Sequence, residues 1–185
     1  MQSEPERASE AALNGTLADI VAIIESAKAR DGRGALEKHI ARTLPEAEAS
    51  EVREASDVAI EVIESIPIFL ARARQESEER GLRSIVDPLL DRAQRYYLQP
   101  VDLIPEMTQG LAGLLDDSYL VIRTLQNLDK GPQPFLDWDL DYPVRFLQRL
   151  IGAPIAQRLD RIALQALEEV STRVEEVWRR TAHRA

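Results

Sequence analysis

Apolar side chains recur at alternating steps of three and four residues between positions 52 and 73. This spacing predicts a long amphipathic helix from about Glu46 to Gly81, with a heptad seam along one side. The seam consists of Val52, Ala55, Ala59, Val62, Ile66, Phe69 and Ala73. Pro67 lies inside this helix, and we expect a kink near Ile63 because the proline ring removes one backbone hydrogen bond.

The C-terminal third carries a second pattern of near-heptad spacing. Its apolar positions are Leu159, Ile162, Ala166, Val170, Val174 and Val177. Residues 143–180 are therefore predicted to form one long helix, or two helices joined near Gly152 and Pro154. The two seams could pack against each other within the chain or pair with a second copy, and both arrangements stay open.

Four shorter helices complete the pattern. They are expected at residues 16–30 with Thr16 as the N-cap, at 35–43, at 83–98 and at about 116–128. No β-strand is predicted. The chain is therefore predicted to be an all-α helical bundle with two long amphipathic helices and a central short helical hairpin at 85–128. Residues 1–15 are expected to form a disordered lead, and residues 16–184 a single all-α domain.

The composition fits a soluble cytoplasmic protein. The net charge of −9 opposes contact with nucleic-acid phosphates, and the only dense basic run is the C-terminal tip, Arg179 to Arg184. The chain has no cysteine, which excludes disulfides, thiolate metal ligands and a cysteine nucleophile. No apolar run approaches the roughly 20 residues of a transmembrane helix. The acidic and polar N-terminus is unlike a signal peptide.

A proline-bounded acidic turn separates two of the predicted helices, in the stretch YYLQPVDLIPEMTQGLAGLLDDSYLVI. Pro100 and Pro105 disfavour helical conformation in the residues before them, so the chain must turn here. Asp102 is expected to accept backbone N–H groups of the turn. Asp116 is expected to cap the following helix, and Asp117 to complement its dipole.

The same turn could instead bind a cation. Mg²⁺ and Ca²⁺ prefer oxygen ligands, and four carboxylates could converge on one ion. The candidate ligands are Asp102, Glu106, Asp116 and Asp117. Hydrogen bonding within the turn explains Asp102, capping explains Asp116 and the helix dipole explains Asp117 without an ion, whereas Glu106 has no evident structural role. The orientation of Glu106 toward the Asp-Asp pair separates the two interpretations.

This stretch resembles the YkvA family, also known as the DUF1232 domain, over about residues 85–125. The matching residues are Tyr97, Pro100, Asp102, Leu103, Ile104, Pro105, Glu106, Gly110 or Gly113, Asp116 and Asp117. The resemblance implies a small helical hairpin domain that occurs frequently in membrane-associated bacterial proteins. It implies no established activity, and it adds peripheral membrane contact to the possible roles of the chain.

Acidic residues also alternate with apolar ones after a Gly- and Pro-rich loop. Asp137, Asp139 and Asp141 occupy the first three ligand positions of an EF-hand loop. Tyr142 stands at the sixth position, where that loop requires Gly, and Gln148 stands in place of the final Glu, so the match fails.

The apolar residues of the same stretch predict an extended segment that lies on the helices. They are Leu136, Trp138, Leu140 and Tyr142. Phe135, Trp138 and Tyr142 could pin this segment to the core or form an exposed recognition patch. His39 and His183 are isolated in the sequence and are expected to be solvated.

None of the common catalytic or nucleotide-binding motifs is present in the sequence. The motif content and the two seams therefore favour a non-enzymatic helical protein that acts through a protein partner or a homodimer. The alternatives are a divalent-metal-binding protein or metal-dependent enzyme that uses the Asp102, Glu106, Asp116 and Asp117 cluster with Mg²⁺ or Ca²⁺, and a peripheral membrane protein.

Overall fold

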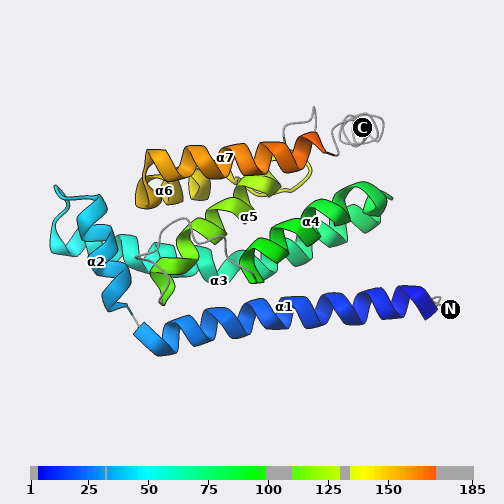
Figure 1. Cartoon of the computed structure of the whole chain (residues 1–185), viewed down its shortest axis with the longest axis horizontal. Helices are drawn as coiled ribbons and strands as arrows, with labels where there is room; N and C mark the ends of the chain where they lie inside the picture. The colour runs from blue at the N-terminus through cyan, green and yellow to red at the C-terminus, as the bar shows by residue number, and fades with distance from the viewer. Residues whose placement is uncertain (1–3, 32, 99–109, 130–133, 170–185) are drawn as a thin grey trace.

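The computed structural model describes residues 4–31, 33–98, 110–129 and 134–169, with side chains in the first helix from Thr16 to Arg30 (Figure 1). Within these ranges the chain is entirely helical apart from connecting segments, which confirms the all-α prediction. The elements are α1 (Glu4–Asp31), α2 (Gly34–Thr43), α3 (Ala49–Glu79), α4 (Arg83–Leu98), the 3₁₀ helix η2 (Leu111–Leu114), α5 (Leu115–Leu128), α6 (Asp141–Ile151) and α7 (Ala153–Glu168). None of these helices is long and apolar enough to span a bilayer.

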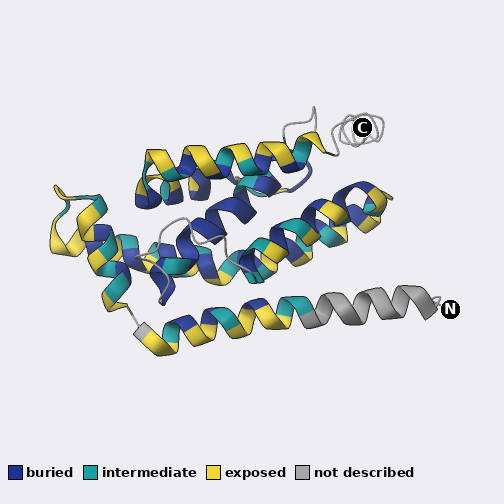
Figure 2. Ribbon diagram, in the orientation of Figure 1, coloured by how far each residue is buried: buried dark blue, intermediate teal, exposed yellow. Residues whose placement is uncertain are grey.

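Helix α5 is the centre of the bundle. It packs against α3 and α4 on one side and against α6 and α7 on the other, and α1 lies outside α3 and α4 (Figure 1). All of its residues except Arg123 and Gln126 are buried, so neighbouring elements cover nearly its whole circumference (Figure 2). A short helix of this kind is stable only when other helices cover every face.

The long predicted helix forms, but a different column of its side chains is buried. Helix α3 runs unbroken past Pro67, and its core residues are Val52, Ser56, Ala59, Ile63, Ile66, Leu70, Ala73, Glu76 and Ser77. The predicted seam members Ala55, Val62 and Phe69 are only half-buried. At every second position the predicted seam is therefore wrong by one residue. The buried residues there are Ser56, Ile63 and Leu70.

Helix α3 stops where the sequence predicted, at Gly81. Gly81 has a positive φ of 65°, and its N–H donates to the Glu78 carbonyl oxygen at 3.0 Å. The N–H of Leu82 donates to the Ser77 carbonyl oxygen at 2.7 Å. These two bonds form a Schellman motif, which satisfies the last carbonyl groups of the helix and turns the chain into α4.

The N-terminal helix differs from its prediction. It begins at Glu4 instead of Thr16, so the residues expected as a disordered lead are helical from Glu4 onward. Helix α1 is consequently the second long helix among the described residues, with 28 residues against the 31 of α3. The buried residues of its described face are Ile20, Ile24 and Ala27.

The C-terminal third is two helices within the described residues. Gly152, with φ 83° and ψ 153°, separates α6 from α7, and only glycine adopts this backbone conformation without strain. Helix α7 packs mainly on α5 and buries Ala156, Leu159, Ala163 and Ala166. The small alanines allow close approach of the two helices. The seam positions Val170, Val174 and Val177 lie outside the described residues.

The segment before α6 is pinned to the core, which agrees with the first of the two alternatives. Phe135 is buried, and the guanidinium of Arg80 lies 5.3 Å from the centre of its ring. The Trp138 ring contacts Phe69 at 5.0 Å between centroids. Tyr142 differs, because it belongs to the first turn of α6 and is 57% exposed.

Candidate functional site

The structure describes half of the predicted acidic cluster. Asp102 and Glu106 lie outside the described residues, so their orientation is not tested. Asp116 and Asp117 lie in the first turn of α5 and are only 6% and 4% exposed. Two adjacent carboxylates are thus buried at the start of the central helix.

Asp116 is not the N-cap that the sequence predicted. The N-cap of α5 is Leu114, because the 3₁₀ helix η2 continues directly into α5 and shifts the helix start by two residues. The Asp116 Oδ1 accepts the backbone N–H of Asp117 at 3.1 Å. Both carboxylates therefore lie inside the first turn, where the helix dipole stabilises negative charge, as expected for Asp117.

A buried tyrosine and serine adjoin this acidic pair. The Tyr97 hydroxyl from α4 lies 3.5 Å from Ser118 Oγ on α5. Burial raises the pKa of Tyr97, and the negative charge of Asp117 contributes to the shift. Tyr97 therefore stays protonated and serves as a neutral polar group beside the carboxylates.

The described residues do not complete a metal site. Among them, no group of three or more acidic, histidine or cysteine side chains is placed so that it could hold a metal ion. A cation at Asp116 and Asp117 would need further ligands from Asp102 or Glu106. Within the described residues, Asp116 and Asp117 therefore form a buried carboxylate pair that the helix dipole stabilises.

A second polar region lies between α5, α6 and α7, and the sequence analysis did not identify it. The Asp160 Oδ1 accepts the Tyr119 hydroxyl at 2.7 Å and the Arg123 Nε–H at 2.9 Å. The Gln126 amide donates to Asp141 at 2.5 Å. A cavity of about 380 Å³ opens beside these groups, lined by Arg123, Gln126, Asp129, Trp138, Asp139, Leu140 and Asp141. These polar groups bond mainly to one another, so the region ties three helices together.

Asp129 closes the loop that follows α5. Its Oδ1 accepts the backbone N–H of Phe135 at 2.5 Å and of Leu136 at 2.8 Å. Burial raises the pKa of the Asp129 carboxyl, against the opposing effect of these two hydrogen bonds and the nearby Arg80. The folded protein therefore favours the neutral carboxyl more than the unfolded chain does.

Asp129→Asn is expected to leave stability at pH 7 unchanged or slightly higher, because the amide keeps an acceptor oxygen without a charge. Asp129→Ala is expected to cost about 1–3 kcal/mol, because two buried N–H groups lose their acceptor. A carboxyl whose pKa is raised by folding lowers stability as pH rises through its titration range. Any advantage of Asp129→Asn should therefore shrink as the pH is lowered into that range. Urea unfolding at neutral and acidic pH measures both effects, and equal losses for the two variants would contradict this account.

Two of the three acidic residues that suggested an EF-hand, Asp139 and Asp141, have other roles. The Asp139 Oδ1 accepts the backbone N–H of Asp141 at 2.9 Å, at the start of α6. Asp141 accepts the Gln126 amide on the neighbouring helix α5. These contacts fix the start of α6 on the bundle.

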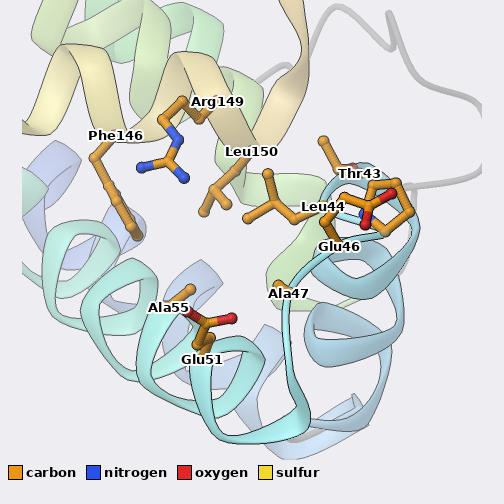
Figure 3. A pocket seen from close by; sticks show the side chains of 10 residues that line it. Thr43, Leu44, Glu46, Ala47, Glu51, Ala55, Phe146, Arg149 and Leu150 are labelled. Carbon is orange, nitrogen blue, oxygen red and sulfur yellow. The ribbon is translucent and has the colours of Figure 1, made fainter.

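An apolar groove lies between the α2–α3 connection and α6 (Figure 3). Its volume is about 410 Å³. Its apolar walls are Leu44, Ala47, Ala55, Phe146 and Leu150, and Thr43, Pro45, Glu46, Glu51 and Arg149 complete the lining. We call this site the α3–α6 groove. In Figure 3, Phe146, Arg149 and Leu150 extend from α6 toward Glu51 and Ala55 on α3.

Two local contacts fix the walls of the groove. The Nε2 of His39 donates to the Leu150 carbonyl oxygen at 2.7 Å and holds α2 on α6. His39 is therefore half-buried and structural, not solvated as the sequence suggested. At the opposite wall, Glu51 accepts the backbone N–H of Glu48 at 2.8 Å, which is one half of a capping box at the start of α3.

The fold and the groove define an all-α helical bundle with a surface site suited to an apolar ligand or helix. No protein-family model, curated protein or solved structure matches the chain. The resemblance of residues 85–125 to the YkvA family therefore stays a prediction.

Proposed function

We propose that this chain is a non-enzymatic helical protein that acts by binding another protein chain through the α3–α6 groove. The groove itself is the observation that carries the proposal. Its volume of about 410 Å³ and its leucine, alanine and phenylalanine walls suit the apolar side chains of a partner helix. Helices that bind in grooves insert side chains from one apolar face in this way.

Aromatic side chains extend the apolar surface beyond the groove. Tyr142, one turn before Phe146 on α6, stacks on the Phe146 ring at 6.2 Å between centroids and 10° between planes. Tyr142 is one of only four large apolar side chains that are exposed among the described residues. Exposed aromatic residues beside an apolar groove are typical of the centres of protein interfaces.

Site-specific photocrosslinking in the source cells tests the proposal. A benzophenone amino acid at Ala47, inside the groove, is expected to give a discrete protein adduct. The same amino acid at Leu164, exposed on α7 and outside the groove lining, serves as the matched control and should not give that adduct.

Ala55→Glu in the same chain is expected to abolish the adduct at Ala47, because it places a charge on the apolar wall. Circular dichroism verifies that this variant stays helical. The absence of any adduct at Ala47, or equal adducts at the two positions, would contradict binding through the groove.

A metal-binding role is the second candidate, and the burial of Asp116 and Asp117 favours it. Buried carboxylates are stabilised by cations as well as by helix dipoles. On this interpretation, titration calorimetry detects Mg²⁺, Ca²⁺ or Mn²⁺ binding that Asp116→Asn and Glu106→Gln each abolish. Binding that survives Glu106→Gln would show that the predicted cluster is not the site, and no binding to the wild type would leave Asp116 and Asp117 with only their structural role in the first turn of α5.

A further inference from the structure

The α3–α6 groove carries opposite charges on its two sides. Arg149 lies on the α6 side, and Glu46 and Glu51 lie on the side of the α2–α3 connection and α3. All three side chains are exposed. Elsewhere in the described chain, arginine side chains commonly pair with carboxylates of the same molecule, as Arg33 does with Asp57.

Among the described residues, no ion pair joins Arg149 to either glutamate of the groove. The known contact of Glu51 uses its Oε2 for the backbone N–H of Glu48, within its own helix end. The opposite charges therefore face the groove without neutralising each other, and a partner can meet both. A partner that presents a cation to one side and an anion to the other is complementary to both charges.

A second copy of this chain meets that requirement by symmetry. In a two-fold interface the same surface is used on both subunits, so that residue i contacts residue j and residue j contacts residue i. The charges of such a surface, a cation on one side and an anion on the other, are complementary to those of a second copy related by a two-fold axis. We propose that the partner in the groove is a second copy, docked across a two-fold axis so that Arg149 of each copy lies against Glu51 of the other.

The apolar side chains of the groove supply the centre of this interface. Phe146 lines the groove from α6, on the same side as Arg149, and Tyr142 is stacked beside it on α6. In the dimer these rings pack against their symmetry mates and leave water. The inference rests on the proposed function, since it names the partner for the same groove.

The overall charge does not prevent this pairing. Each copy carries a net charge of −9, which opposes association at long range. At physiological ionic strength charges are screened beyond about 8 Å, so the local pairs of Arg149 and Glu51 decide the interaction at contact. Electrostatic complementarity of this kind fixes the orientation of partners more than it sets affinity.

Sedimentation equilibrium on the full chain tests the inference by charge reversal. The wild type is expected to show a monomer–dimer equilibrium. Arg149→Glu and Glu51→Arg are each expected to weaken the dimer by about tenfold or more, because each places like charges together at both contacts. An equimolar mixture of the two variants is expected to dimerise as tightly as the wild type, because both contacts then join opposite charges.

Two controls separate association from folding. Glu51→Gln keeps an acceptor for the Glu48 N–H and removes only the charge, so it should weaken the dimer less than Glu51→Arg does. Thermal unfolding of every variant identifies any loss of the fold. A wild type that stays monomeric, a mixture no tighter than the single variants, or growth beyond the dimer would each overturn the inference.

The outcomes also separate this inference from the proposed function. A monomeric wild type together with a groove adduct to a different protein overturns only the identity of the partner. A monomeric wild type without any groove adduct overturns both.

Discussion

Leu125→Ala is expected to lower the free energy of unfolding by about 2–5 kcal/mol, which is the range for removing a fully buried leucine. Leu125 has no exposed surface and lies on α5, the helix that four others cover. The smaller side chain leaves a cavity that the surrounding helices cannot easily close, because α5 is held on several sides at once. Urea unfolding followed by circular dichroism measures the loss.

Leu164→Ala is the matched control for this prediction. It is the same substitution on the neighbouring helix α7, at a side chain that is 47% exposed. Its cost is expected to stay below about 1 kcal/mol, because less apolar surface is returned to water. Similar losses for the two variants would show that α5 is not the central helix.

Ile63→Ala is expected to cost about 2–5 kcal/mol for a related reason. Ile63 is fully buried on α3, in the column of side chains that includes Ser56 and Leu70. The sequence placed Val62 in that column instead. The experiment therefore tests the orientation of α3 about its own axis as well as the burial of one residue.

Ile68→Ala on the same helix is the control. Ile68 is 62% exposed, and alanine has the higher helix propensity, so the expected change is within about 0.5 kcal/mol of zero. Chemical denaturation of both variants under identical conditions gives the comparison. A loss at Ile68 as large as the loss at Ile63 would mean that the helix faces the bundle differently.

The sequence pattern did not predict the orientation of α3 about its own axis correctly. Val62 and Ile63 are adjacent apolar residues, and so are Phe69 and Leu70, so two parallel columns satisfy helical spacing equally well. Because the apolar stripe is wide, its spacing alone does not determine which column of side chains faces the core. The positions of α2, α4 and α5 around α3 select the column that becomes core, and the other column stays half-buried.

The start of α5 shows a second limit. The Asp-Asp pair was expected at a helix start, and it lies there, but the 3₁₀ turn from Leu111 to Leu114 moves the cap to Leu114. Local cap rules recognise the side chains that suit a first turn. These rules do not account for a 3₁₀ helix that directly precedes the α-helix and moves the helix start toward the N-terminus.

The polar contacts of α5 needed the structure for another reason. Arg123 in α5 and Asp160 in α7 are joined by an ion pair of 2.9 Å across 37 residues. The signal in the sequence is Arg123, the only charged residue of α5 beyond the Asp-Asp pair of its first turn. Such a signal indicates that a buried partner exists without identifying it.

The sequence by itself determined the helical class of this protein, the approximate position of most helices and the glycine stop at Gly81. These features depend on spacing, capping and backbone preference, which act over a few residues. Only the tertiary structure decided that α5 is central, which column of α3 is buried, and that Ala55 and Phe146 meet in one groove. The walls of that groove come from segments about ninety residues apart, and such proximity follows from the packing of whole helices, which no local pattern encodes.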